Sequence, residues 1–397
     1  MKHIKTFSDF LNEKYKRIFE LHKDFSDAKT TVISPERLAK DLNSEIERMD
    51  KNITLGGKDQ VKRDVKIPIV TRNMFNTFTD ENGSFDADKF RALITERPKT
   101  IFDQNAKMVK TDYGVNQLTV NTGIPALKGI VVDEDNGKFV YVNTCPGAGS
   151  CILACYARHG FYTFQDQKVK NLINRLNFMM NDPDGYIKQI LEELTPIANN
   201  IKEMENGFDE YVLKLRWNDA GDFFSKKYLE IAKTVTKELS KICDVQSYAY
   251  SKITEIVIDG KDNDITMNFS TDASTKEIKK AKSAPEKVGK FAIIIPKKVF
   301  ANFFKRVGPH ISVDAMRGLP LFKDKNEKEL LRQAVVDYIN KENPELKTSV
   351  DKVLFTPELS KITESDKNMY DVIVLPKGDT DISAQRKDVR CTFLLQH

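Results

Sequence analysis

The chain has 397 residues, of which 40% are hydrophobic and 30% are charged, and its 63 basic and 58 acidic residues leave a formal net charge of +5. This composition predicts an ordinary globular protein of one or two domains, and the near balance of charge argues against a domain dedicated to nucleic acid. No apolar run approaches the roughly 18 residues of a membrane span, and the charged N-terminus does not resemble a signal peptide. We therefore expect a cytoplasmic protein with no membrane partner.

Residues 1–115 are predicted to form a helical accessory region. Apolar residues recur at helical spacing over residues 10–21, and Ser34 is expected to cap a second helix that extends to about Met49. Residues 60–115 are mixed in pattern, with prolines, glycines and asparagines that interrupt any periodicity. They carry no motif that marks a second catalytic domain.

From residue 116 to 397 short β-branched runs alternate with helical stretches. The expected strands cover residues 139–143, 211–217, 245–250, 265–269, 291–295 and 372–375, and the clearest helices cover 167–180, 186–199 and 327–340. Strand and helix in repeated alternation are typical of parallel α/β architecture. The predicted fold is a partial or complete parallel β/α barrel, in which ligands bind at the carboxyl ends of the strands.

Three of the five cysteines lie within eleven residues, directly after the predicted strand at 139–143. Cys145, Cys151 and Cys155 have the spacing C-x5-C-x3-C in a loop rich in glycine. Thiolates are preferred ligands of Fe–S clusters and zinc, and clustered cysteines in a reducing cytosol favour metal binding over disulfides. The alternatives are an Fe–S cluster with one open iron, zinc with His159 as fourth ligand, and unligated thiols. We favour the cluster because the spacing differs from the paired C-x2-C of common zinc sites.

A second candidate site follows the strand at 211–217. In the run Asn218-Asp219-Ala220-Gly221-Asp222, the carboxylates of Asp219 and Asp222 and the flexible Gly221 suit a loop that contacts a polar ligand. The alternative is a strand-to-helix turn in which Asp222 or Ser225 caps the next helix.

Other candidates are weaker. The next two strands end in polar groups that either line a pocket or form turns, namely Tyr248, Tyr250, Ser251, Lys252, Asn268 and Ser270. His310 and Asp314 form a possible acid/base pair, and structural roles are the alternative. Cys243 and Cys391 are expected to be buried thiols, with Cys391 as a remote fourth cluster ligand the alternative.

These motifs resemble a known family. The segments Cys145-Pro146-Gly147-Ala148 and Cys155-Tyr156-Ala157-Arg158, with Leu215-Arg216 and Ala220-Gly221-Asp222-Phe223-Phe224-Ser225, are similar to the "gene product 88" family of phage proteins. The resemblance covers roughly residues 115–397. This family is in turn similar to radical S-adenosylmethionine enzymes, in which a loop with three cysteines holds a [4Fe–4S] cluster.

The resemblance implies a cofactor site. Cys145, Cys151 and Cys155 would hold the cluster, with the aromatic Tyr156 beside the last cysteine and S-adenosylmethionine on the open iron. Asp219 and Asp222 would lie near the amino group of S-adenosylmethionine. The usual radical-enzyme spacing is C-x3-C-x2-C, and this chain has longer intervals.

The expected function is an Fe–S cluster enzyme of phage origin in the host cytoplasm. Its substrate is a small molecule, a nucleotide or a macromolecule, and nucleic acid is one candidate. The alternative is a non-catalytic phage protein, stabilised by a metal, that binds nucleic acid or another protein.

Overall fold

The computed structural model describes residues 24–54, 70–80, 82, 84–112, 116–134, 136–155, 157, 161–205, 211–261, 265–295, 325–362, 369–374 and 381–395. The predicted helix at residues 10–21 lies outside these ranges, as do Tyr156, His159, His310 and Asp314. Their predicted roles remain predictions.

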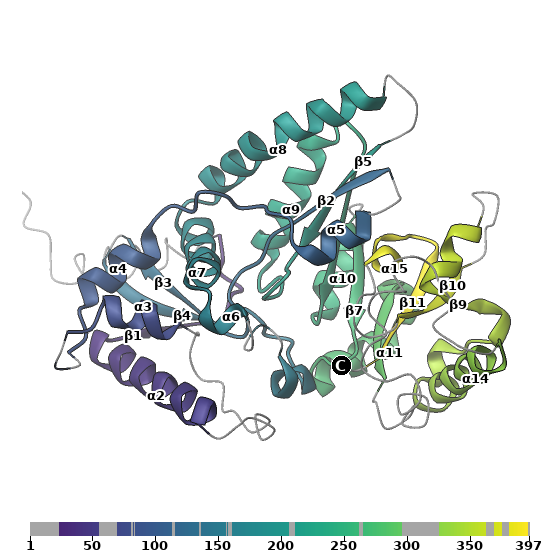
Figure 1. The fold of residues 1–397 in the computed structure, drawn as a ribbon, viewed down its shortest axis with the longest axis horizontal. Helices are drawn as coiled ribbons and strands as arrows, with labels where there is room; N and C mark the ends of the chain where they lie inside the picture. The colour runs from purple at the N-terminus through teal and green to yellow at the C-terminus, as the bar shows by residue number, and fades with distance from the viewer. Residues whose placement is uncertain are drawn as a thin grey trace, which may run out of the picture.

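An eight-stranded parallel sheet forms the centre of the molecule (Figure 1). Its strands, in spatial order, are β2 (Gln117–Asn121), β5 (Val212–Trp217), β6 (Val245–Ser251), β7 (Ile265–Ser270), β8 (Phe291–Ile295), β11 (Val389–Leu395), β10 (Tyr370–Val374) and β9 (Val353–Phe355). Every neighbouring pair is parallel. The α/β class is thus confirmed, and the sheet is consistent with a partial or complete β/α barrel.

The chain reverses its direction across the parallel sheet at β9, which forms the far edge. From β2 to β8 the parallel strands follow the chain, but the last strand, β11, lies next to β8, and β10 and β9 lie beyond it. Because strand crossovers are right-handed, connections that run in opposite directions across a sheet lie on opposite faces. The helices are divided accordingly.

One face of the sheet is apolar and is covered by helices. These are α8 (Pro183–Glu205), α9 (Lys226–Leu239), α10 (Thr254–Lys261), α11 (Thr275–Ser283), α12 (Pro285–Val288) and α14 (Lys325–Glu342). Their buried side chains join alternate residues of the strands in one hydrophobic cluster, which includes Leu215, Trp217, Phe269 and Phe393. Burial of this continuous apolar surface is the main stabilising contribution to the sheet.

The opposite face is polar over β2, β5, β6 and β7, and is covered by α5 (Ala106–Asp112) and α15 (Ile382–Gln385). Asn268 of β7 donates its side-chain amide to the Ala384 carbonyl at 3.1 Å, and the Lys290 ammonium donates to the Ser383 carbonyl at 2.6 Å. Asp381, which precedes α15, accepts a hydrogen bond from the Tyr248 hydroxyl at 3.2 Å. The chain after β10 therefore closes this face by hydrogen bonds over β6, β7 and β8, whereas Ile382 of α15 packs against a small hydrophobic cluster with Val372 and Val374 of β10.

A separate three-stranded antiparallel sheet lies to the side, in the order β1 (Thr30–Ile33), β4 (Lys138–Val142) and β3 (Gly129–Asp133). It packs with α2 (Pro35–Thr54), α3 (Arg72–Thr77), α4 (Ala87–Thr95) and α7 (Asp166–Asn181), while α6 (Phe161–Phe164) contacts α7. Its hydrophobic cluster joins Leu42 and Phe90 to Ile130 and Phe139. Apolar side chains from both sides of residue 115 thus share one cluster, and the division at that residue remains a prediction.

Local sequence accounts for several helix starts. Ser34 precedes α2 and accepts a hydrogen bond from the Arg37 amide at 3.2 Å, as the capping pattern predicted. Ser225 caps α9 by accepting from the Tyr228 amide, also at 3.2 Å. Short 3-10 helices cover Ser150–Ala154, Pro344–Leu346, Val350–Lys352 and Thr356–Lys361. Within the described ranges, no helix has both the length and the apolar character needed to cross a membrane.

Candidate functional site

The cysteine loop does not follow a strand of the parallel sheet. The strand expected at 139–143 is present as β4, but it belongs to the antiparallel sheet. Its place in the parallel series was therefore predicted wrongly. Pairing with β1 and β3 places β4 in the antiparallel sheet. The pattern of side chains along one strand predicts the strand itself but not the strands with which it pairs.

The loop nevertheless lies across the carboxyl ends of three parallel strands. The Asp222 amide, after β5, donates to the Thr144 carbonyl at 3.0 Å. The Ser274 amide donates to the Gly147 carbonyl at 2.8 Å, and the Cys151 amide donates to the Asp272 carbonyl at 3.4 Å, both after β7. Backbone hydrogen bonds thus bring the loop to the edge where ligands bind in parallel α/β folds.

Two glycines make this approach possible. A Cβ atom on Gly147 would lie 2.4 Å from the Lys252 carbonyl oxygen, and one on Gly149 would lie 2.0 Å from the Ala273 carbonyl oxygen. Both distances are far below van der Waals contact with rigid backbone, so only glycine fits. The glycines allow the loop to reach the ends of β6 and β7 closely, in addition to folding around the cysteines.

The three cysteines are half-buried and contact different neighbours. The Cys145 sulfur accepts a hydrogen bond from the Leu127 amide at 3.2 Å, and Cys151 lies in the 3-10 helix that continues the loop. Cys155 packs with Tyr162 and Ala220, next to the second candidate loop. The three thiols nevertheless lie near enough to one another that Cys155 raises the pKa of both Cys145 and Cys151.

The thiols of Cys145 and Cys151 are held in their neutral form. Burial, with a smaller contribution from the carboxylates of Asp222 and Asp272, raises the pKa of Cys145 to about 12 and that of Cys151 to about 11. Within the described part of the chain, no group of three or more His, Cys, Asp or Glu side chains is arranged to hold a metal ion. The ligand geometry of a metal site is therefore not preformed in the described residues. What fits a metal centre is the chemistry of the donors, because three thiols lie on one loop at the edge of the sheet.

Lys252, at the end of β6, supplies positive charge beside the loop. Its ammonium lies 3.4 Å from the Asp272 carboxylate. Burial lowers the pKa of Lys252, but Asp272, Cys151, Asp222 and Cys145 raise it, and the net pKa lies above the ordinary value. The lysine therefore remains charged next to two of the three cysteines.

Asp222 is used by the backbone of two loops. Its carboxylate accepts hydrogen bonds from the Phe223 amide at 2.7 Å and the Lys252 amide at 2.9 Å, and its exposed fraction is 2%. Burial raises the pKa of this carboxyl group. Asp222 thus connects the loop after β5 to the end of β6. Of the two residues that could have capped the next helix, Asp222 and Ser225, it is Ser225 that caps α9.

Asp219 belongs to a different network on the polar face. It accepts from the Tyr162 hydroxyl at 2.9 Å and lies 3.5 Å from the Arg216 guanidinium. Arg216 also lies 3.2 Å from Asp381, whose carboxylate pairs with Lys107. Burial raises the pKa of Asp381, but Arg216 and Lys107 lower it further, so the carboxylate stays ionised.

The turn that carries both carboxylates has a left-handed backbone at two residues. Asn218 has φ of 62° and Gly221 has φ of 79°. A Cβ atom on Gly221 would also lie 2.4 Å from Ile124. Gly221 is therefore required by the shape of the turn, which leaves its predicted contact with a cofactor untested.

The two strand-end residues of β7 have separate positions. The Ser270 hydroxyl donates to Asp272 at 2.6 Å and so supports the carboxylate that pairs with Lys252. Asn268 is fully buried and donates to the Ala249 and Ala384 carbonyls at 3.0 and 3.1 Å. Ser270 joins the cysteine-loop site, whereas Asn268 holds the segment around α15.

The remaining cysteines are part of the interior. Cys243 and Cys391 both lie in the main hydrophobic cluster, and Cys391 is fully buried. The expectation of buried thiols is confirmed. Tyr162, Asp272 and Asp381 were missed by the sequence analysis, because isolated polar residues in helices and loops carry no spacing signal.

Comparison with known families gives one result. A family model described as Gene product 88 matches residues 99–316, which is more than half of the chain and includes the cysteine loop and the turn at residues 218–222. No curated protein and no solved structure matches the chain.

Proposed function

The chain belongs to the Gene product 88 family of phage proteins, and from this membership and its cysteine loop we propose that it is an Fe–S cluster enzyme resembling radical S-adenosylmethionine enzymes. The observation that carries the proposal is the position of the loop. Three thiols lie at the carboxyl edge of a parallel sheet, beside a charged lysine. This edge is where parallel α/β enzymes bind their ligands.

Cys145, Cys151 and Cys155 would hold the cluster. Three thiolates on a [4Fe–4S] cluster leave one iron for an exogenous ligand, and when bound the cluster supplies an electron to a sulfonium such as that of S-adenosylmethionine. Because the metal-free thiols of Cys145 and Cys151 are neutral near pH 7, loading must release protons and is expected to be favoured by higher pH.

Two charged groups would orient the bound molecules. Lys252 offsets the negative charge of the ligating thiolates, and Asp272 and Asp222 hold its side chain and backbone in place. Asp219, positioned by Tyr162 and Arg216, presents a carboxylate to an ammonium group such as that of S-adenosylmethionine. The substrate is a small molecule, a nucleotide or a macromolecule.

Metal analysis of anaerobically purified protein tests the proposal. We expect iron and sulfide in the wild type, loss of both in Cys145→Ser, Cys151→Ser and Cys155→Ser, and retention of both in Cys243→Ala, which lies in the hydrophobic cluster. Addition of S-adenosylmethionine should change the electron paramagnetic resonance spectrum of the reduced cluster.

Other outcomes separate the alternatives. One zinc per chain without iron would reject the enzyme and support a metal-stabilised binding protein. A cluster whose spectrum does not change when S-adenosylmethionine is added would support an Fe–S protein and reject the radical mechanism. If the wild type and Cys145→Ser were equally stable and neither contained metal, both the Fe–S enzyme and the metal-stabilised binding protein would be rejected.

A further inference from the structure

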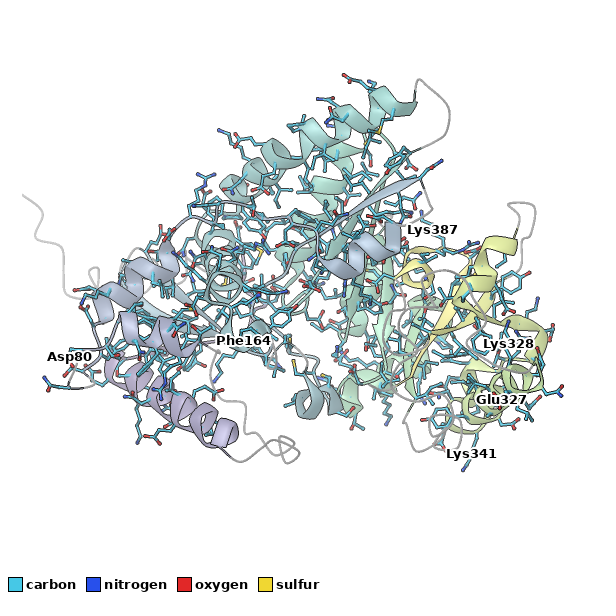
Figure 2. All side chains as sticks on the ribbon, in the orientation of Figure 1. Asp80, Phe164, Glu327, Lys328, Lys341 and Lys387 are labelled. Carbon is cyan, nitrogen blue, oxygen red and sulfur yellow. The ribbon has the colours of Figure 1, made fainter. Side chains whose placement is uncertain are left out.

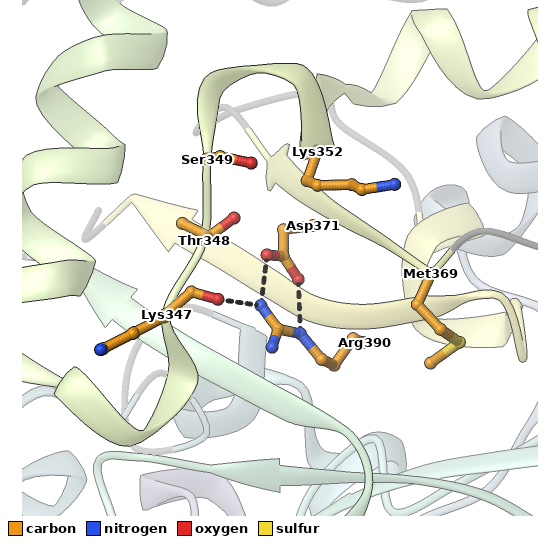
Figure 3. Close-up of a pocket in the computed structure, with 7 residues that line it drawn as sticks. All are labelled: Lys347, Thr348, Ser349, Lys352, Met369, Asp371 and Arg390. Atoms are coloured by element: carbon orange, nitrogen blue, oxygen red, sulfur yellow. Dashed lines mark hydrogen bonds and ion pairs between the residues drawn. The ribbon is translucent and has the colours of Figure 1, made fainter.

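A pocket of about 390 Å³ lies at the edge of the parallel sheet opposite to the cysteine loop (Figure 3). Lys352 directly precedes β9, and Asp371 and Arg390 are the second residues of β10 and β11. Because these strands are parallel, their amino ends share one edge. The pocket is therefore separate from the site proposed above and independent of it.

The pocket carries an excess of positive charge. Arg390 binds Asp371 through two hydrogen bonds, from Nε at 3.2 Å and from Nη2 at 2.7 Å (Figure 3). This pair neutralises the pocket's carboxylate. Lys347 and Lys352 have no carboxylate within ion-pair distance among the described residues, and the Lys352 ammonium lies 5.7 Å from the centre of the Tyr370 ring.

The wall of the pocket is held in a defined shape. The Asn340 side chain forms hydrogen bonds with the Thr348 carbonyl at 3.0 Å and the Thr348 amide at 2.9 Å. Arg390 Nη2 donates to the Lys347 carbonyl at 2.9 Å. The loop is thus fixed at these two adjacent residues before any ligand binds, which lowers the entropy cost of binding.

Two polar groups in the wall have hydrogen-bonding capacity left. The Thr348 hydroxyl is buried and has no hydrogen-bond partner among the described residues. Arg390 uses Nε and Nη2, and Nη1 has no partner within the same part of the chain. A buried hydroxyl without a partner is unfavourable, so a rotation of the Thr348 side chain toward an acceptor in the pocket would relieve this cost.

We propose that this pocket binds the phosphate group of a small phosphate monoester. The Lys347 and Lys352 side chains extend to opposite sides of the Asp371–Arg390 pair (Figure 3), and both are flexible enough to turn toward a ligand bound between them. Two ammonium groups, a guanidinium N–H and a hydroxyl would match the charge and the several acceptor oxygens of a phosphate dianion better than those of a single carboxylate. The volume is in the range of small-molecule sites, and Met369, 47% exposed, offers apolar surface for the rest of the molecule.

Calorimetric titration with inorganic phosphate and with AMP tests the proposal on the full chain. We expect saturable binding of at least AMP, weakened about 10-fold or more in the double variant Lys347→Gln/Lys352→Gln, because charge-assisted hydrogen bonds are lost. Thr348→Val should also weaken binding. Equal affinity for both ligands would mean that the phosphate alone is recognised, and tighter AMP binding would mean that the pocket also holds the nucleoside.

The matched control removes two positive charges elsewhere. Lys341 on α14 and Lys188 on α8 are 81% and 75% exposed, and both lie outside the pocket (Figure 2 labels Lys341). Lys341→Gln/Lys188→Gln should bind AMP as the wild type does. The proposal is overturned if neither ligand binds at millimolar concentration, if both double variants lose affinity equally, or if only a single-stranded oligonucleotide binds. Unchanged thermal unfolding of the variants shows that the fold is kept.

Discussion

Lys252 is the residue whose position gives the cysteine loop its electrostatic character. Its ammonium pairs with Asp272, its amide donates to Asp222, and its carbonyl lies against Gly147. One residue therefore contacts the loops after β5 and β7 as well as the cysteine loop. Groups that surround metal ligands in this way tune how firmly the metal is held.

We predict that Lys252→Gln weakens metal retention roughly 10- to 100-fold, because the thiolates lose their nearest positive charge. Iron that remains after a chelator challenge measures this effect. Lys226→Gln is the matched control, because this substitution removes the same charge from a side chain that is 64% exposed at the start of α9. If Lys252→Gln retained iron like this control while its unfolding temperature was unchanged, the role of Lys252 would be refuted.

Residue types alone identified part of this site. Cys145, Cys151, Cys155 and Asp222 were found from spacing and from the turn pattern, and Lys252 was noted as a strand-end residue. Asp272 and Tyr162 were not found, because they approach the site only through the packing of α6 and the loop after β7. A side chain without a local pattern becomes recognisable only when its neighbours are known.

At the scale of elements, the cysteine loop behaves as an extension of the parallel sheet. An antiparallel bridge joins Ala148 to Ala273, and the hydrogen bonds on either side continue it toward Cys151. This pairing depends on the close approach of Gly149 to the backbone after β7. The loop and the sheet edge should therefore respond together to changes at Gly149.

We predict that Gly149→Ala separates the loop from β7 and reduces both stability and metal content. The new Cβ would lie 2.0 Å from the Ala273 carbonyl oxygen, and neither backbone can yield without breaking hydrogen bonds. We expect a loss of about 1–3 kcal/mol in unfolding free energy, measured by urea denaturation. Ser150→Ala, at an exposed position in the same loop, is the control. Equal stability of the two variants would contradict the predicted contact.

At the scale of the whole molecule, β11, the last strand along the chain that the structure describes, lies inside the parallel sheet. β11 pairs with β8 on one side and β10 on the other, and its residue Phe393 lies in the main hydrophobic cluster. The family match ends at residue 316, before β9, β10 and β11. The matched segment by itself therefore lacks three strands of the sheet.

We predict that deletion of residues 381–397 prevents cooperative folding. The deletion exposes the edges of β8 and β10 and removes Asp381, which pairs with Arg216 and Lys107. Unpaired interior strand edges also favour aggregation. Circular dichroism during heating should show no cooperative transition for the deleted chain, and limited proteolysis should degrade it rapidly. A transition equal to that of the full chain would show that the first five strands of the sheet fold independently.

The sequence by itself determined the α/β class, many of the helices and strands, and the cysteine loop as the principal candidate site. These features follow from local periodicity, capping residues and cysteine spacing, which act over a few residues. Only the tertiary structure decided that β4 pairs with β1 and β3, that β11 lies between β8 and β10, and that Lys252 and Asp272 meet the cysteine loop. Strand order and contacts between loops depend on which buried surfaces fit together, and residues distant in sequence decide that fit.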